Sequence, residues 1–212
     1  MTKPKIILIG AGGHCRSCVD VIEQEGRFDI LGVVDKSGGD DPNSVLGYPL
    51  IGTDADLPEL RKKCEYALVT VGQIKSPVVR IRLFEMLKEL GFELPTVISP
   101  LAYVSKHAEV NEGSIVMHHA LVNVNAKIGF NCILNTKCLI EHDAVIGNHV
   151  HISTEAIVNG ASNVWNNSFV GSGAIVTHGV TLPERSFVRA GKLVVSDKDC
   201  RDRKTIKCQR LT

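Results

Sequence analysis

Apolar residues follow two different patterns along the chain, one in each half. In the first half, short apolar runs lie at 5–9, 30–34 and 66–71, and apolar residues at helical spacing follow the first and the third run. Such runs predict buried strands, and the spacing predicts amphipathic helices over 16–24 and 81–90. Strands that alternate with helices indicate a parallel sheet with helices on its faces.

The second half has a strict period of six. All fifteen positions reached in steps of six from Val104 to Val188 are Val, Ile or Leu. The residue four places further on is small or of modest size, as in Ala120, Cys138 and Ala156. This period predicts a parallel β-helix in which three hexads make one triangular coil. The aliphatic residue points inward, the small residue fits the corner, and residues 18 apart stack at about 4.8 Å.

The stacking rule places particular residues above one another. His142 lies 18 residues before Gly160 and 36 before His178. The coil above His142 therefore presents no side chain there, which leaves room for a substrate to reach the imidazole. His151 lies nine residues, or half a coil, beyond His142. If both histidines serve one site, that site lies between two subunits, so the sequence predicts an oligomer.

A glycine-rich segment follows the first predicted strand. Glycines let backbone N–H groups approach a phosphate, and the start of the next helix adds a favourable dipole. The dinucleotide pattern G-x-G-x-x-G is incomplete because its third glycine is replaced by Cys15. Ligands of parallel sheets bind beyond the carboxyl ends of the strands. The candidate residues for a nucleotide or nucleotide sugar are therefore Gly10, Gly12, Gly13, His14, Asp35, Lys36 and Gly72. A purely structural tight turn is the alternative.

Charge and cysteine content narrow the function further. The 212 residues include 24 Lys and Arg against 23 Asp and Glu, which offers no basic footprint for nucleic acid. No apolar run approaches the roughly 18 residues of a membrane span, so we expect a soluble, cytoplasmic protein. The seven cysteines are irregularly spaced, which favours reduced thiols. Cys15 and Cys18 form a C-x-x-C at a helix start, and two small buried residues are the favoured interpretation.

The chain combines a glycine-loop unit with a triangular β-helix, or prism, that contains the pattern N-T-x-x-x-x-E-H-D over 135–143. In this combination it resembles the hexapeptide-repeat sugar acetyltransferases. That family includes sialic acid O-acetyltransferases and bacillosamine-pathway N-acetyltransferases. The resemblance covers residues 4–191. It implies a Rossmann-like nucleotide-sugar domain over 1–99, a left-handed β-helix over 100–192, a charged tail over 193–212 and a homotrimer.

The same resemblance implies site residues and a co-substrate. His142 corresponds to the catalytic base and Asp143 to its neighbour, while His151 and Asn135 match positions of the acetyl-CoA site. A backbone N–H near Gly160 is the candidate oxyanion donor. Acetyl-CoA is then the co-substrate and no metal is expected. A histidine suits removal of a proton from an attacking amine or hydroxyl, and Asp143 or Glu141 could fix its tautomer. Direct transfer is expected because no cysteine has a base beside it.

The leading hypothesis is an N-acetyltransferase that acts on a nucleotide-linked amino sugar, with UDP as the first choice of nucleotide, in bacterial surface-glycan synthesis. One alternative is an O-acetyltransferase of sialic or legionaminic acid-type sugars. Another is a non-catalytic partner of a sugar synthase. A prism-type carbonic anhydrase would need zinc held by three of His119, His142, His151 and His178. In the tail, Lys192, Arg201 and Lys204 could meet coenzyme phosphates, although a solvated basic face is favoured.

Overall fold

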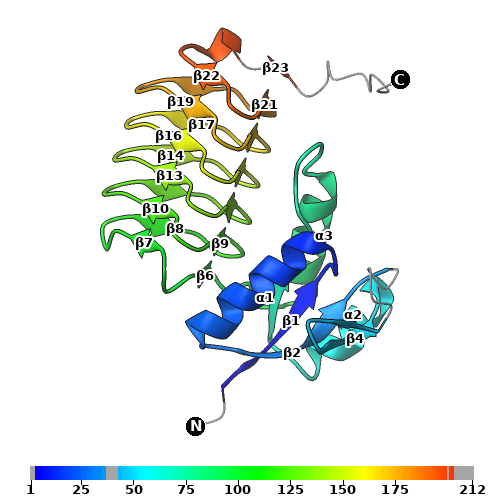
Figure 1. Cartoon of the computed structure of the whole chain (residues 1–212). Helices are drawn as coiled ribbons and strands as arrows, with labels where there is room; N and C mark the ends of the chain where they lie inside the picture. Colours follow the sequence, from blue (N-terminus) through cyan, green and yellow to red (C-terminus); the bar gives the residue numbers. More distant parts are fainter. Residues whose placement is uncertain (1–2, 37–42, 200, 203–212) are drawn as a thin grey trace.

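The computed structural model describes residues 3–36, 43–199 and the backbone of 201–202. It consists of an α/β unit followed by a left-handed parallel β-helix, as the sequence predicted (Figure 1). The glycine- and aspartate-rich stretch after Lys36 lies outside the described residues, and so do Lys204 and the side chain of Arg201. Most of the predicted tail lies outside them as well.

The α/β unit contains a five-stranded sheet in the order β3-β4-β2-β1-β5. The strands are β1 (Lys5–Ile9), β2 (Asp29–Val34), β3 (Ser44–Val45), β4 (Tyr48–Gly52) and β5 (Tyr66–Val69). Strands β4, β2, β1 and β5 pair in parallel, which confirms the predicted sheet, whereas β3 and β4 form an antiparallel hairpin that the apolar pattern did not reveal. Strand β5 ends two residues earlier than expected, and the Arg80 guanidinium donates to the carbonyls of Val69 and Val71 at this end.

Three helices cover this sheet: α1 (Gly13–Glu25), α2 (Leu57–Arg61) and α3 (Val78–Glu89). A short 3-10 turn, η1 (Asp54–Asp56), precedes α2. Helix α1 begins three residues before the expected start, directly after the N-cap Gly12, and ends at Gly26 in the left-handed conformation with φ 69°. Helix α1 packs between the sheet and the first coils of the prism, whereas α2 and α3 pack on the opposite face of the sheet (Figure 1).

The prism is built from three parallel sheets of short strands. We name them by their outer surfaces. The covered sheet consists of β6 (Val97–Ile98), β9 (Ile115–Val116), β12 (Ile133–Leu134), β15 (His151–Ile152), β18 (Phe169–Val170) and β21 (Ser186–Val188), with β23 (Arg201–Asp202) added antiparallel. The apolar sheet consists of β7 (Tyr103–Val104), β10 (Leu121–Val122), β13 (Leu139–Ile140), β16 (Ile157–Val158), β19 (Ile175–Val176) and β22 (Leu193–Val194). The polar sheet consists of β8 (Glu109–Val110), β11 (Lys127–Ile128), β14 (Val145–Ile146), β17 (Asn163–Val164) and β20 (Thr181–Leu182). A last 3-10 turn is η2 (Asp197–Asp199).

The predicted inward and corner positions form the prism core. The aliphatic residue of each hexad is the second residue of its strand, and with the small corner residues it makes one continuous cluster. Strands 18 residues apart pair in register, for example Leu139 with Ile157. Strands β6 and β22 pair within the prism although they lie just outside 100–192.

The corners contain a second periodic feature. From Ser114 to Ser186, the residue before each small corner residue has a positive φ, as in Asn125 (58°), Asn131 (52°) and Asp143 (61°). This left-handed conformation suits Gly and Asn best, because a β-carbon strains it. It turns the chain sharply enough to bring the next two-residue strand onto the adjacent sheet.

The first residue of each strand points outward, and the three sheets differ in what it is. On the covered sheet Val97, Ile115 and Ile133 are buried under α1. On the polar sheet the outward residues are Glu109, Lys127, Val145, Asn163 and Thr181. On the apolar sheet they are Tyr103, Leu121, Leu139, Ile157, Ile175 and Leu193, and each of them is partly or largely exposed.

Buried polar groups join the α/β unit to the prism. Gln73 donates to the carbonyls of His149 (2.9 Å) and Ser168 (3.3 Å). Arg80, which is 1% exposed, donates to the carbonyls of Val69 and Val71 and to the side-chain oxygen of Asn131. On the other side of α1, the ring of His118 lies between Asp20 and Ser99, 2.6 Å from each.

Two histidines near this junction are held in the neutral form. Burial is the main cause, with the Arg80 charge second, and together they lower the pKa of His14 to about 3 and that of His149 to about 4. In the unfolded chain a histidine titrates near 6.5. The unfolded state therefore binds more protons than the folded state below that pH, and stability falls as the pH drops from about 6.5 towards 4.

We expect His149→Asn to flatten this loss of stability. Asparagine tolerates the left-handed conformation of His149, where φ is 56°, and removes one titrating group. The measurement is the thermal midpoint of both proteins between pH 7 and pH 4.5. Parallel curves for the two proteins would contradict the assignment of His149 as a source of acid destabilisation.

Candidate active site

The His142 imidazole is held by the carboxylate next to it in sequence. Both lie in the corner turn between β13 and β14, where they are about half exposed. The Nδ1 of His142 lies 2.8 Å from Oδ2 of Asp143. Because an ionised carboxylate only accepts hydrogen bonds, Nδ1 carries the proton and Nε2 is left as the basic nitrogen. The predicted pair therefore forms, with Asp143 as the partner of the ring.

The sequence left open whether Asp143 or Glu141 fixes the tautomer of His142, and Glu141 bonds to other groups instead. Its Oε2 accepts hydrogen bonds from the Asn123 amide (2.8 Å) and from the backbone N–H of His142 (3.1 Å). It therefore fixes the backbone of the turn, whereas Asp143 orients the ring.

Gly160 lies where the stacking rule places it. A β-carbon at Gly160 would lie 2.6 Å from Nε2 of His142, closer than real side-chain contacts. Two coils would separate stacked residues by about 10 Å, yet the rings of His142 and His178 have centroids only 6.4 Å apart. The His142 ring thus occupies part of the space beside Gly160, so some of the room predicted there is taken by the imidazole itself.

Asn135 lies at the other edge of the apolar sheet from His142, and His151, on strand β15 of the covered sheet, contacts it. His151 is 5% exposed, and its ring packs edge-on against Phe169 with the centroids 5.2 Å apart. Its Nδ1 bonds to the Gln73 carbonyl, and its Nε2 lies 3.2 Å from the Asn135 amide. His151 therefore joins the loop after β5 to Asn135, a link that the sequence did not predict.

The carboxyl ends of β1, β2 and β5 border a cavity of about 280 Å³. Gly10, Asp35 and Lys36 line it, as predicted for a nucleotide site. Gly10 has φ 112°, and the position of a β-carbon there is filled by Val71, so only glycine fits. Asp35 accepts a hydrogen bond from the Ala11 N–H at 2.6 Å, which ties the end of β2 to the glycine loop.

The sequence did not predict two charged residues that line this cavity. Asp54 lies 3.0 Å from Arg82 and 3.9 Å from Lys36, so one carboxylate and two cations face the same space. Arg82 is on α3 and Asp54 starts η1, far from the glycine loop in sequence. The only signal for them was their position after β4 and β5, at the binding edge of the sheet.

The remaining predicted loop residues lie around the start of α1. Gly12 and Gly13 are exposed there, with open space at both α-carbons. Gly72 approaches His14, since its β-carbon would lie 3.5 Å from that of His14. The Nε2 of His14 is buried and has no partner among the described residues. Cys15 and Cys18 are buried as expected, and burial raises the pKa of both thiols.

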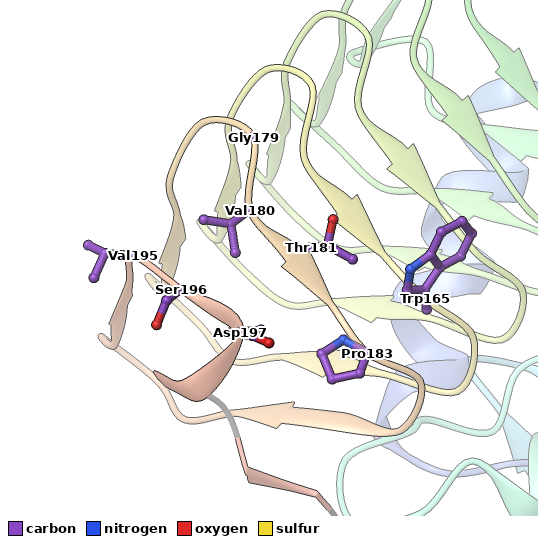
Figure 2. A pocket seen from close by; sticks show the side chains of 8 residues that line it. All are labelled: Trp165, Gly179, Val180, Thr181, Pro183, Val195, Ser196 and Asp197. Carbon is purple, nitrogen blue, oxygen red and sulfur yellow. The ribbon is translucent and has the colours of Figure 1, made fainter.

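A cavity of about 490 Å³ lies at the C-terminal end of the prism. Trp165 and Pro183 lie towards one end, and Val195 and Ser196 towards the other (Figure 2). Gly179, which follows His178, also lines it. Within the described residues no three His, Cys, Asp or Glu side chains gather as metal ligands, and no helix is long and apolar enough to cross a membrane.

Comparison with known proteins identifies the family. Residues 5–87 match the model of the PglD N-terminal domain. The acetyltransferase domain of PglB from Neisseria gonorrhoeae is 30% identical, with a TM-score of 0.83 over 92% of this chain and 93% of that one. The chain belongs to the hexapeptide-repeat sugar acetyltransferases.

Other members of this acetyltransferase family have been solved with ligands. PerB from Caulobacter crescentus, in complex with CoA and GDP-perosamine, is 31% identical, with a TM-score of 0.84 over 91% of this chain and 89% of that one. The same PglB domain in complex with acetyl coenzyme A is 28% identical, with a TM-score of 0.83 over 94% of this chain and 99% of that one. No curated protein sequence matches the chain significantly.

We expect Gly160→Ala to lower the rate of acetyl transfer by about a hundredfold or more. The added methyl group collides with Nε2 of His142 and displaces the basic nitrogen, and displacement of about 1 Å can cost this much. The measurement is kcat for the variant, with the thermal midpoint as a check on folding. In a His142→Ala background the same substitution has little further effect, because the ring it displaces is gone. Equal losses in both backgrounds would contradict this explanation.

Proposed function

We propose that the protein is an acetyl-CoA-dependent N-acetyltransferase of a nucleotide-linked amino sugar. The observation that carries the proposal is the His142–Asp143 pair beside Gly160, in a chain whose α/β unit has a charged cavity at its nucleotide-binding edge. The relatives support it, because PerB is solved with CoA and a nucleotide-linked amino sugar and PglB with acetyl-CoA.

His142 acts as the general base in direct transfer. The amine nitrogen of the sugar attacks the thioester carbonyl carbon and its proton moves to Nε2 of His142, while Asp143 stabilises the imidazolium. The carbon–sulfur bond then breaks and coenzyme A leaves as the thiol, taking the proton. The N–H of Ala161 is already bonded to the His142 carbonyl at 3.0 Å, so we assign the oxyanion contact to the N–H of Gly160.

The corner that carries His142 also offers a path for the coenzyme. His178 occupies the position equivalent to Gly160 one coil further along this corner. The next residue, Gly179, lines the cavity beside Trp165. An acetyl-CoA with its thioester at His142 extends along this line towards the cavity. Asp197 lines that cavity as well, so its coenzyme end combines an aromatic surface with polar groups.

The acceptor occupies the cavity at Gly10, Asp35 and Lys36, with its phosphates towards Gly12 and Gly13 at the start of α1. Neutral His14 and Gly72 border the same loop. UDP is the first nucleotide to test, and GDP stands beside it because PerB is solved with GDP-perosamine.

The His142 corner and the proposed acceptor site approach each other only between two subunits. The α/β unit packs on the covered sheet, and Asn135 with His151 lies at one edge of the apolar sheet, whereas His142 lies at the other edge. A cyclic trimer that packs the apolar sheet against a neighbour brings unlike edges together. His142 of one subunit then meets the acceptor loop, Asn135 and His151 of the next.

The substrate test is mass spectrometry after incubation with acetyl-CoA and UDP-, GDP- and CMP-linked amino sugars, together with free sialic and legionaminic acids. We expect the mass of one acetyl group to be added to a nucleotide-linked amino sugar. We expect His142→Ala to lower kcat by about 10²- to 10⁴-fold and to leave acetyl-CoA affinity nearly unchanged. Acetylation of the free acidic sugars alone would favour the O-acetyltransferase, and an equally active His142→Ala variant would remove the assigned base.

The assembly test is Leu121→Glu. Leu121 is an outward residue of the apolar sheet, away from the assigned site residues, and a buried carboxylate there opposes subunit packing. We expect loss of the trimer in size-exclusion chromatography with light scattering, together with loss of acetyl transfer. Lys127→Glu, at the same strand position on the polar sheet, is the matched control. A Leu121→Glu protein that remains trimeric would show that another surface forms the interface.

A further inference from the structure

We propose that Asn125 is a positioning residue for acetyl transfer, which holds the Asp143 carboxylate in the orientation that aligns His142. The inference rests on the proposed function, because it concerns the same catalytic pair. Asn125 was not among the residues that the sequence suggested, and it lies outside the N-T-x-x-x-x-E-H-D pattern.

The period of the prism brings Asn125 and Asp143 together. They are 18 residues apart and occupy equivalent corners of successive coils, one directly above the other. Both are in the left-handed conformation, with φ 58° and 61°, so their side chains leave the corner in the same direction. The Nδ2 of Asn125 lies 2.6 Å from Oδ1 of Asp143.

The carboxylate is therefore held at both oxygens. Oδ1 accepts from Asn125, and Oδ2 accepts from Nδ1–H of His142 at 2.8 Å. An ionised carboxylate has no hydrogen to donate, so the amide nitrogen of Asn125, and not its oxygen, must face it. With Oδ1 fixed, the carboxyl group cannot rotate away from the ring without breaking this bond.

Two neighbouring asparagine–carboxylate pairs hold different parts of His142. Asn123 and Glu141 form a parallel pair two residues earlier in each coil, and Glu141 holds the backbone N–H of His142. Asn125 and Asp143 hold the imidazole itself. The hydrogen bond from Asn125 is also the largest cause of the lowered pKa of Asp143, ahead of that from His142. This bond therefore favours the ionised carboxylate, the form that accepts from both partners.

The orientation has a direct consequence for the chemistry. Only a ring with its proton on Nδ1 presents a basic Nε2 to the gap beside Gly160. A freely rotating Asp143 would leave the two neutral tautomers and several ring orientations populated. Loss of Asn125 should therefore reduce the fraction of enzyme that is ready to accept the proton, without removing the base.

The test is Asn125→Gly in the full-length protein. Glycine adopts φ 58° without strain, so the turn is preserved while the amide is lost. We expect kcat to fall about tenfold, the equivalent of one hydrogen bond to a charged group, with an unchanged KM for acetyl-CoA. The matched control is Asn167→Gly, which removes an asparagine at φ 65° that donates to Glu184 at 2.9 Å on another corner. The control should retain full activity.

A second readout does not depend on turnover. Nitrogen-15 NMR of the His142 ring reports which nitrogen carries the proton, and we expect Asn125→Gly to shift the ring from the Nδ1–H form towards a mixture. In an Asp143→Ala background, Asn125→Gly should have no further effect on kcat. Wild-type kcat and an unchanged tautomer in Asn125→Gly would overturn the inference. If His142→Ala itself were fully active, the proposed function would fail instead.

Discussion

The stacking of coils at 18-residue intervals is the constraint on which the site depends. Backbone hydrogen bonds between equivalent strands fix the register of each coil on the previous one. Side chains 18 residues apart are therefore neighbours at the same corner. This register places Gly160 over the His142 ring and Asp143 over Asn125. The repeated backbone ladder thus determines which side chains surround the His142 imidazole, without any long loop.

The second constraint is the polar junction between the α/β unit and the prism. Arg80 is buried, and carbonyl and amide oxygens supply its hydrogen bonds. A buried charge is costly unless its hydrogen bonds are made, so this arrangement tolerates little movement. Because Arg80 bonds both the end of β5 and Asn131, the loop after β5 is tied to the prism. Gln73 strengthens the same connection through His149, Ser168 and His151.

The histidines of this chain differ in state because their surroundings differ. His14 and His149 are desolvated beside a guanidinium, and both effects disfavour a second positive charge. His142 stands in an open corner with the Asp143 carboxylate at its Nδ1, which leaves Nε2 as the nitrogen without a proton. The neutral, buried histidines therefore suit packing and hydrogen bonding, whereas the geometry of His142 suits the role of base that we propose for it.

The sequence by itself determined the architecture and the positions of several candidate residues. A period of six predicts a prism of stacked coils, and the spacing of 18 between equivalent positions places Gly160 next to His142. It also located the glycine loop and Asp35, because strand ends are visible in the apolar pattern. It did not reveal Arg82, Asp54 or the Gln73–His151 contact, since these join segments whose separation along the chain carries no period. Nor did it choose between Glu141 and Asp143: both flank His142 in sequence, and only the direction in which a left-handed corner projects its side chain decided which carboxylate meets the ring.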